Sequence, residues 1–113
     1  MTGEINFEFN PDWNGENTEL LTQIGYAFET GTVFKQNYSA AFRFYSIAAE
    51  AGNAQALNNM GWLVENGLGA MRDVSQAIKI FEAAANLGNS CAMVNLGNIY
   101  EFGLLNGSPD YKA

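Results

Sequence analysis

The sequence repeats itself with a period of 36 residues, and this repeat constrains the fold more than any other feature. Residues 54–89 match residues 18–53 at ten aligned positions, where composition alone predicts roughly two or three. A third copy begins at Ser90 and keeps several of the shared positions. A period of this length is typical of a solenoid, in which each unit buries its apolar face against its neighbours. The identical pairs are Leu21/Leu57, Gly25/Gly61, Glu29/Glu65, Gly31/Gly67, Ser39/Ser75, Ala41/Ala77, Ala48/Ala84, Ala49/Ala85, Gly52/Gly88 and Asn53/Asn89.

Each copy reads as two helices joined by a short break. In the second copy, apolar residues recur at i, i+3, i+4 and i+7 over two stretches, which Gly67-Leu68-Gly69 separates. We therefore expect a first helix over about 54–67 and a second over about 73–87, packed as an antiparallel hairpin. Asp73 is placed to cap the second helix, and Asn37 takes the same place in the first copy.

The junctions between copies are also repeated. Residues 48–53 read AAEAGN, and residues 84–89 read AANLGN. The alanine pair allows the second helix to pack closely against its neighbours. The glycine can adopt the left-handed conformation that ends a helix, and the asparagine can cap the helix that follows. The two stretches are therefore predicted to join one hairpin to the next.

Glycine occupies the middle of the first helix in all three copies, as Gly25, Gly61 and Gly97. Glycine inside a helix costs about 1 kcal/mol relative to alanine. A cost that recurs at one position indicates a recurring structural need. We expect another helix backbone to approach closely at each of these positions, which requires a residue without Cβ.

The repeat resembles a known family. Residues 92–103 read AMVNLGNIYEFG and residues 73–89 read DVSQAIKIFEAAANLGN. These resemble the two helices of the Sel1-like repeat, a relative of the tetratricopeptide repeat, whose patterns are A-x-x-x-L-G-x-x-Y-x-x-G and D-x-x-K-A-x-x-W-Y-x-x-A-A-x-x-G-N. The resemblance covers roughly residues 18–113. The sequence departs from the family pattern at four positions. Phe44 and Ile80 replace a frequent Trp, and Ala40 and Gln76 replace a frequent Lys. These changes are conservative enough to be compatible with the same fold.

The resemblance implies an all-α protein that forms a right-handed α-solenoid of antiparallel helix hairpins. It would contain an N-terminal arm over residues 1–17, full repeats over 18–53 and 54–89, and a partial third repeat over 90–113. The resemblance also implies a non-catalytic scaffold or adaptor for protein–protein interaction.

A binding surface is expected on the concave face, which the first helix of each hairpin tends to line. The candidates are amide and aromatic side chains opposite the Leu-Gly stripe, because amides can bind a peptide backbone and aromatics offer rigid apolar area. The alternative for Trp62 and Tyr26 is that they pack against a neighbouring helix or loop. The predicted partner-binding residues are Gln23, Tyr26, Gln55, Asn59, Trp62, Asn95, Asn98 and Phe102.

The charge restricts the class of partner. Five basic residues against twelve acidic ones give a net charge of −7, which disfavours nucleic acid and anionic membranes. Five carboxylates lie in the first twenty residues without a basic residue among them, so the partner is either basic or this end is simply solvated. No apolar run is long enough to span a membrane and no signal peptide is evident, which favours a cytoplasmic protein unless a leader has been removed.

Catalytic and metal chemistry are not expected. The chain has no histidine, so neither serine nor cysteine has an imidazole base, and no phosphate-binding loop is present. Cys91 is interpreted as a small helix residue, and no cofactor is expected. Glu29, Glu65 and Glu101 repeat at one position, too far apart to share a metal. We interpret each of them as a carboxylate that holds the backbone of the following loop.

Both ends of the chain leave alternatives open. In residues 1–17, Ile5, Phe7 and Phe9 alternate with polar residues, which fits an extended arm over the first hairpin or a docking motif. Residues 110–113 read as the first turn of a further helix. The first helix of the third copy would then lack its hairpin partner. Either this helix caps the array, or the chain is a fragment of a longer array, or another subunit completes the hairpin. The alternative function is therefore an assembly unit that self-associates through its third repeat.

Overall fold

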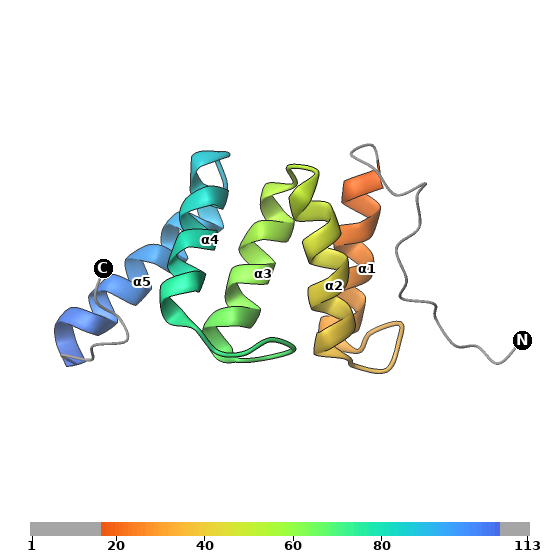
Figure 1. Cartoon of the computed structure of the whole chain (residues 1–113), viewed down its shortest axis with the longest axis horizontal. Coiled ribbons are helices and arrows are strands. Elements are labelled where there is room, and N and C mark those ends of the chain that lie inside the picture. Colours follow the sequence, from red (N-terminus) through yellow and green to blue (C-terminus); the bar gives the residue numbers. More distant parts are fainter. Residues whose placement is uncertain (1–16, 107–113) are drawn as a thin grey trace, which may run out of the picture.

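The computed structural model describes residues 17–106, with side chains to residue 101, and these residues form five helices and no strand. Figure 1 shows them in a row, with α5 at the end opposite α1. No helix among them is long and apolar enough to cross a membrane. Residues 1–16 of the predicted arm and the segment 110–113 lie outside the described residues. The helices are α1 (Thr18–Thr30), α2 (Tyr38–Glu50), α3 (Ala54–Asn66), α4 (Val74–Asn86) and α5 (Ser90–Asn106).

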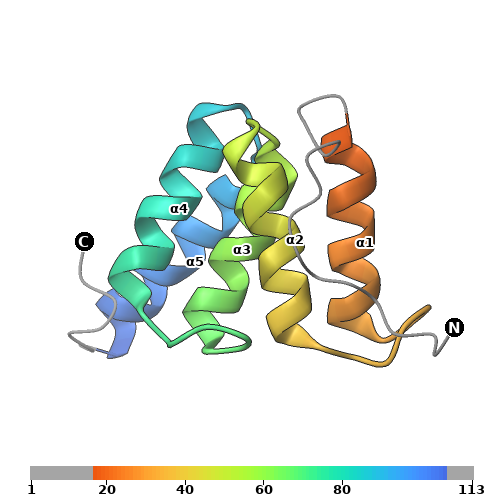
Figure 2. The same ribbon diagram turned by 45° about the vertical axis from the view of Figure 1, so that its right-hand side comes forward.

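The helices form the predicted hairpins. The closest helix pairs are α1 with α2 and α3 with α4, and α2 with α3 and α4 with α5 join one hairpin to the next. Figure 2 shows this succession from a second direction. The predicted solenoid of helix hairpins is confirmed, and the helices predicted at about 54–67 and 73–87 correspond to α3 and α4.

The helices bury one continuous core. A first cluster of buried side chains joins α1, α2 and α3, and a second joins α3, α4 and α5. Phe42 on α2 and Met60 on α3 pack against both clusters and so join them. Because each hairpin buries its apolar face against the next one, the repeats stabilise one another.

Polar side chains cap the helices at the predicted positions. In each case the side-chain oxygen accepts a hydrogen bond from the backbone N–H three residues later: Asn37 caps α2 at 3.0 Å, Asn53 caps α3 at 2.9 Å and Asp73 caps α4 at 2.9 Å. Asn89 accepts one from Ala92 at the start of α5 at 2.9 Å. Such caps contribute about 1 kcal/mol each.

The junctions also behave as predicted. Gly52 and Gly88 have φ values of 94° and 92°, which is the left-handed region. Ala48 and Ala84 are fully buried. These residues therefore set where each hairpin ends and let it pack tightly against the next.

The three helical glycines have different surroundings, which partly corrects the expectation of close backbone contact. A Cβ placed on Gly25 would lie 2.7 Å from the ring of Tyr45, and one on Gly61 would lie 2.7 Å from the ring of Phe81. An aromatic side chain of the following helix, and not chiefly its backbone, therefore occupies the space. The prediction is wrong for Gly97, where a Cβ would meet no atom of the described residues within 4 Å.

The Glu29 carboxylate does not hold the following loop as expected, whereas the loop after Glu101 lies outside the described residues. The Tyr45 hydroxyl donates to the Glu29 carboxylate at 2.7 Å, which joins α2 to α1. Burial, and then this hydrogen bond, raise the pKa of Tyr45 well above its usual value, while an Asn59 hydrogen bond acts in the opposite direction. The loop between α1 and α2 is instead held by Gln36, whose side-chain amide donates to the Glu29 main-chain carbonyl at 2.9 Å.

Glu65 differs from Glu29 because Phe81 stands where Tyr45 stands and has no hydroxyl to donate. Desolvation raises the pKa of Glu65 above its usual value, and the charge of Arg72 lowers it in part. The fold therefore favours protonated Glu65. The stability that protonation contributes is present below the pKa of the unfolded chain and is lost as pH rises through the folded pKa.

Replacing Glu65 with Gln should consequently stabilise the protein at pH 7, because the amide is neutral at all pH values. The difference from the wild type should vanish below about pH 4, where the wild-type carboxyl becomes protonated in both states. Urea unfolding at several pH values measures this, with Glu82→Gln on the exposed side of α4 as a control. A difference that does not change with pH would show that charge is not the cause.

Candidate functional site

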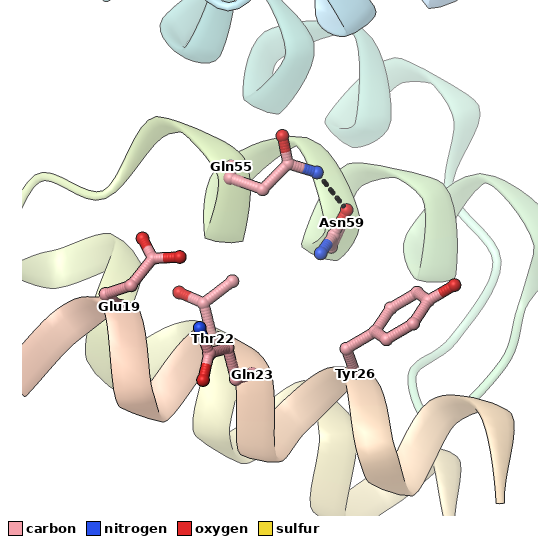
Figure 3. Close-up of a pocket in the computed structure, with 6 residues that line it drawn as sticks. All are labelled: Glu19, Thr22, Gln23, Tyr26, Gln55 and Asn59. Carbon is pink, nitrogen blue, oxygen red and sulfur yellow. Dashed lines mark hydrogen bonds between the residues drawn. The ribbon is translucent and has the colours of Figure 1, made fainter. Parts of the chain in front are cut away.

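A groove of about 250 Å³ lies between α1 and α3. Figure 3 shows side chains from both helices facing each other across it. On α1 the lining positions are spaced i, i+3, i+4 and i+7, and on α3 they are spaced i and i+4, so each set lies on one face of its helix. We call this surface the α1–α3 groove; its lining residues are Glu19, Thr22, Gln23, Tyr26, Gln55 and Asn59.

Hydrogen bonds fix the amides on the α3 side of the groove. Gln55 donates from Nε2 to the Asn59 side-chain oxygen at 2.9 Å, as Figure 3 shows. Asn89, the cap of α5, donates from Nδ2 to Gln55 Oε1 at 3.1 Å. The last residue of the second repeat therefore helps to orient a side chain that lines the groove between the first two repeats. A side chain held in this way loses less conformational entropy when a ligand binds.

The α1 side of the groove combines an aromatic ring with polar groups. Tyr26 is 53% exposed, so about half of this residue is accessible to a ligand. Thr22 is buried, and its hydroxyl donates to the Thr18 carbonyl at 2.7 Å within the same helix. The exposed Gln23 amide has no hydrogen-bond partner among the described residues. This wall therefore offers apolar area together with an amide that can both donate and accept.

The electrostatic character of the groove is acidic. Glu19 is the one charged side chain that lines it. Within residues 17–106, the first helices of the hairpins, α1, α3 and α5, contain four glutamates and no Lys or Arg. The basic residues of this region lie instead on α2, α4 and the loops. They are Lys35, Arg43, Arg72 and Lys79.

Four of the eight predicted partner-binding residues share the groove. They are Gln23, Tyr26, Gln55 and Asn59. The structure thus brings together side chains from two repeats that are about thirty residues apart in the sequence. Whether they bind a partner stays a prediction.

The other four predicted residues do not line the groove or, for Phe102, are not described. Trp62 is 39% exposed on α3, outside the groove lining. Asn95 donates to the Asn58 side-chain oxygen at 2.8 Å and so ties α5 to α3. Asn98 is exposed on α5, and the side chain of Phe102 lies outside the described residues.

Two lining residues, Glu19 and Thr22, were not among the predicted set. A helical signal for them exists, because they precede Tyr26 by seven and four positions and therefore share its face. Glu19 was instead assigned to the acidic end of the chain. Thr22 is neither an amide nor an aromatic, the two types on which the prediction was based.

The described residues also limit metal and thiol chemistry. No group of three or more Cys, Asp or Glu side chains lies close enough in this part of the chain to hold a metal ion. Cys91 is exposed at the start of α5, as a small residue of the first helical turn.

Comparisons with known proteins agree with this architecture. The family model described as Sel1 repeat matches residues 19–53, 54–89 and 92–113. The chain is similar to a crystal structure of a protective antigen from uropathogenic Escherichia coli with an SLR fold, at 28% identity and a TM-score of 0.73, over 78% of this chain and 19% of the antigen.

A Sel1 repeat protein from Oxalobacter formigenes is similar at 27% identity and a TM-score of 0.68, over 72% of this chain and 61% of that one. The matches therefore span less than two thirds of either solved structure. A comparison with curated proteins found no match.

Proposed function

Because the chain belongs to the Sel1 repeat family, we propose that it is a non-catalytic scaffold that binds a segment of another protein in the α1–α3 groove. Sel1 repeat proteins generally mediate protein–protein interactions, and the family is typically non-catalytic. The observation that carries the proposal is the convergence of three amides and one exposed aromatic ring on this single groove.

The chemistry of the groove suits an extended segment. Gln23 has free donors and acceptors among the described residues, so it can pair with both the N–H and the C=O of a peptide backbone. Gln55 and Asn59 are already oriented by hydrogen bonds. Tyr26 adds rigid apolar area at low entropic cost, which is the property that makes tyrosine frequent at binding hot spots.

The charge of the groove favours a basic segment. Glu19 can pair with a Lys or Arg of the ligand, and no basic side chain lines the groove to repel it. The net charge of −7 adds a long-range attraction for a cation. Because such attraction is screened by salt, binding should weaken as ionic strength rises.

Selection of peptides from a random displayed library against the full chain tests the proposal. We expect the selected peptides to be enriched in Lys or Arg and to lose roughly tenfold or more in affinity on Tyr26→Ala, as for a hot-spot side chain. Glu19→Gln should reduce the salt dependence of binding more than the affinity at high salt.

Met71→Ala is the matched control, because Met71 is 90% exposed and lies outside the groove lining. It removes a large exposed apolar side chain away from the groove. Trp62→Ala shows whether the site continues along α3. If the selected peptides bind the Tyr26→Ala and Gln23→Ala proteins as tightly as the wild type, the groove is not the binding site.

Self-association through the third repeat is the second candidate function. Met93 and Val94 on α5 are 52% and 61% exposed, so this helix presents apolar area. Light scattering over a concentration series decides this, because a constant monomer mass rejects it.

A further inference from the structure

A chain of hydrogen bonds joins the α1–α3 groove to a buried tyrosine on α2. Tyr45 is fully buried, and its hydroxyl donates to the Glu29 carboxylate at 2.7 Å. The Asn59 side chain, which lines the groove, also forms a hydrogen bond with this hydroxyl. Neither Tyr45 nor Glu29 lines the groove, yet both are connected to a side chain that does.

The Glu29 end of this chain fixes the direction of its hydrogen bonds. An ionised carboxylate only accepts, and a tyrosine hydroxyl has a single hydrogen to donate. Because Tyr45 gives that hydrogen to Glu29, its oxygen must accept from Asn59, and the Asn59 nitrogen is the group that faces it. In agreement, the Asn59 hydrogen bond opposes the rise in the Tyr45 pKa, because a donor favours the phenolate form.

The other end of the chain fixes the same direction independently. The Ala92 backbone N–H only donates, and the Asn89 side-chain oxygen accepts from it at 2.9 Å. The Asn89 nitrogen then donates to Gln55 Oε1 at 3.1 Å, and Gln55 Nε2 donates to Asn59 Oδ1 at 2.9 Å. Figure 3 shows this last bond, with the Asn59 oxygen turned toward Gln55. Both ends therefore require the same orientation of the Asn59 amide.

The next repeat shows the same amide without these neighbours. Asn95 occupies the position of Asn59 one repeat later. There Phe81 replaces the tyrosine and Cys91 replaces the glutamine, so neither hydrogen-bond partner is present. Asn95 instead donates to the Asn58 side-chain oxygen at 2.8 Å. The partners of the amide, and not its repeat position, therefore decide how it is used.

The orientation of Asn59 determines what it offers to a ligand. An amide nitrogen carries two N–H groups, and the Tyr45 oxygen takes one of them. The second N–H remains for a group in the groove, which Asn59 lines. A peptide carbonyl can accept this hydrogen, whereas a peptide N–H cannot. Turning the amide over to accept from the ligand would place its oxygen against the Tyr45 oxygen, which has no hydrogen left for it.

We propose that Asn59 donates a hydrogen bond to a main-chain carbonyl oxygen of the bound segment, and that Tyr45 and Glu29 are positioning residues that set the Asn59 amide for this contact. The inference rests on the proposed binding of a protein segment in the α1–α3 groove. It adds the polarity of one contact: the groove offers a carboxylate to a cation at Glu19 and a donor to a carbonyl at Asn59.

The positioning role is tested first without a ligand. Tyr45→Phe should fold, because Phe81 already packs in the same way against the equivalent glycine of the next repeat. In nuclear magnetic resonance spectra of isotope-labelled protein, the Asn59 side-chain amide signals should shift in this variant. Their hydrogens should also exchange several-fold faster with solvent. The Gln23 side-chain amide on the opposite wall is the internal control and should keep its signals.

Affinity is then measured with the tightest Lys- or Arg-containing peptide selected from the displayed library. Tyr45→Phe should weaken binding by roughly two- to tenfold, as for one hydrogen bond. In an Asn59→Ala background the same substitution should have no effect, because no amide is left to position. Glu29→Gln keeps an acceptor for the tyrosine and should retain most of the affinity, whereas Glu29→Ala should weaken binding as Tyr45→Phe does. Circular dichroism checks that each variant is folded.

The carbonyl contact is located by replacing each main-chain carbonyl oxygen of that peptide in turn with sulfur, a weaker acceptor. One replacement should weaken binding to the wild type and have little effect on binding to Asn59→Ala. If no replacement behaves in this way, the carbonyl assignment is wrong.

Two further results would contradict the proposal at different levels. Unchanged Asn59 signals in Tyr45→Phe, or equal losses of affinity with and without the Asn59 side chain, would overturn the positioning role while the groove remained the binding site. Peptides that bind Tyr26→Ala as tightly as the wild type would reject the groove itself, and with it the carbonyl contact.

Discussion

Replacing Gly61 with alanine is expected to destabilise the protein by about 1–3 kcal/mol, the usual cost of overpacking a core. The same substitution at Gly97 should stabilise it by up to about 1 kcal/mol, the difference in helix propensity. The signs differ because a Cβ at Gly61 lies 2.7 Å from the Phe81 ring, whereas a Cβ at Gly97 has no neighbour within 4 Å among the described residues. Urea unfolding followed by circular dichroism measures both changes.

Gly25→Ala is the matched control for Gly61→Ala. Its Cβ would lie 2.7 Å from the Tyr45 ring and 3.3 Å from the Ala41 carbonyl oxygen, so it should also destabilise. Equal effects at all three positions would indicate that helix propensity alone decides them. The ring contacts would then play no part in the choice of glycine.

Replacing Phe81 with alanine should have the largest effect of the substitutions considered, about 3–5 kcal/mol of destabilisation. Phe81 is fully buried, covers Gly61 and belongs to the cluster that joins α3, α4 and α5. Its removal leaves a cavity within a hairpin whose other side chains are already packed. Chemical denaturation measures the loss, and Leu87→Ala, at a residue that is 55% exposed, should cost little by comparison.

The contact between Phe81 and Gly61 predicts a specific coupling between their substitutions. In a Phe81→Leu background the ring edge is absent, so adding a methyl at Gly61 should cost less than it does in the wild type, or nothing. A double-mutant cycle over the two sites measures this coupling, because residues in direct contact give non-additive effects. Additive effects would show that the ring does not press on Gly61.

Much of the fold could be predicted from the sequence because the relevant interactions are local. The period of apolar residues places α3 and α4, and Asn53 caps α3 through the N–H of Ala56, three residues away. Gly52 ends the preceding helix through its own backbone conformation. None of these features requires knowledge of which helix lies next to which.

The candidate site could be predicted only in part. Helical periodicity places Gln23 and Tyr26 on one face, and the repeat places Gln55 and Asn59 on the corresponding face of the next hairpin. The sequence did not reveal that Asn95 is used to hold Asn58, because that hydrogen bond joins residues 37 positions apart. The sequence pattern does not distinguish an amide exposed on one helix from an amide that lies between two helices.

The division between the two kinds of information is clearest at the repeated positions. Residue type and spacing decide where each helix begins, where it ends and which of its sides is apolar, because these depend on a few neighbouring residues. Packing alone decides that Gly25 lies under an aromatic ring while Gly97 is exposed. It also decides that the Glu29 carboxylate accepts a hydrogen bond from the Tyr45 hydroxyl, sixteen residues away. Identical residues in a repeat therefore acquire different roles, because each role depends on the helix that packs against it.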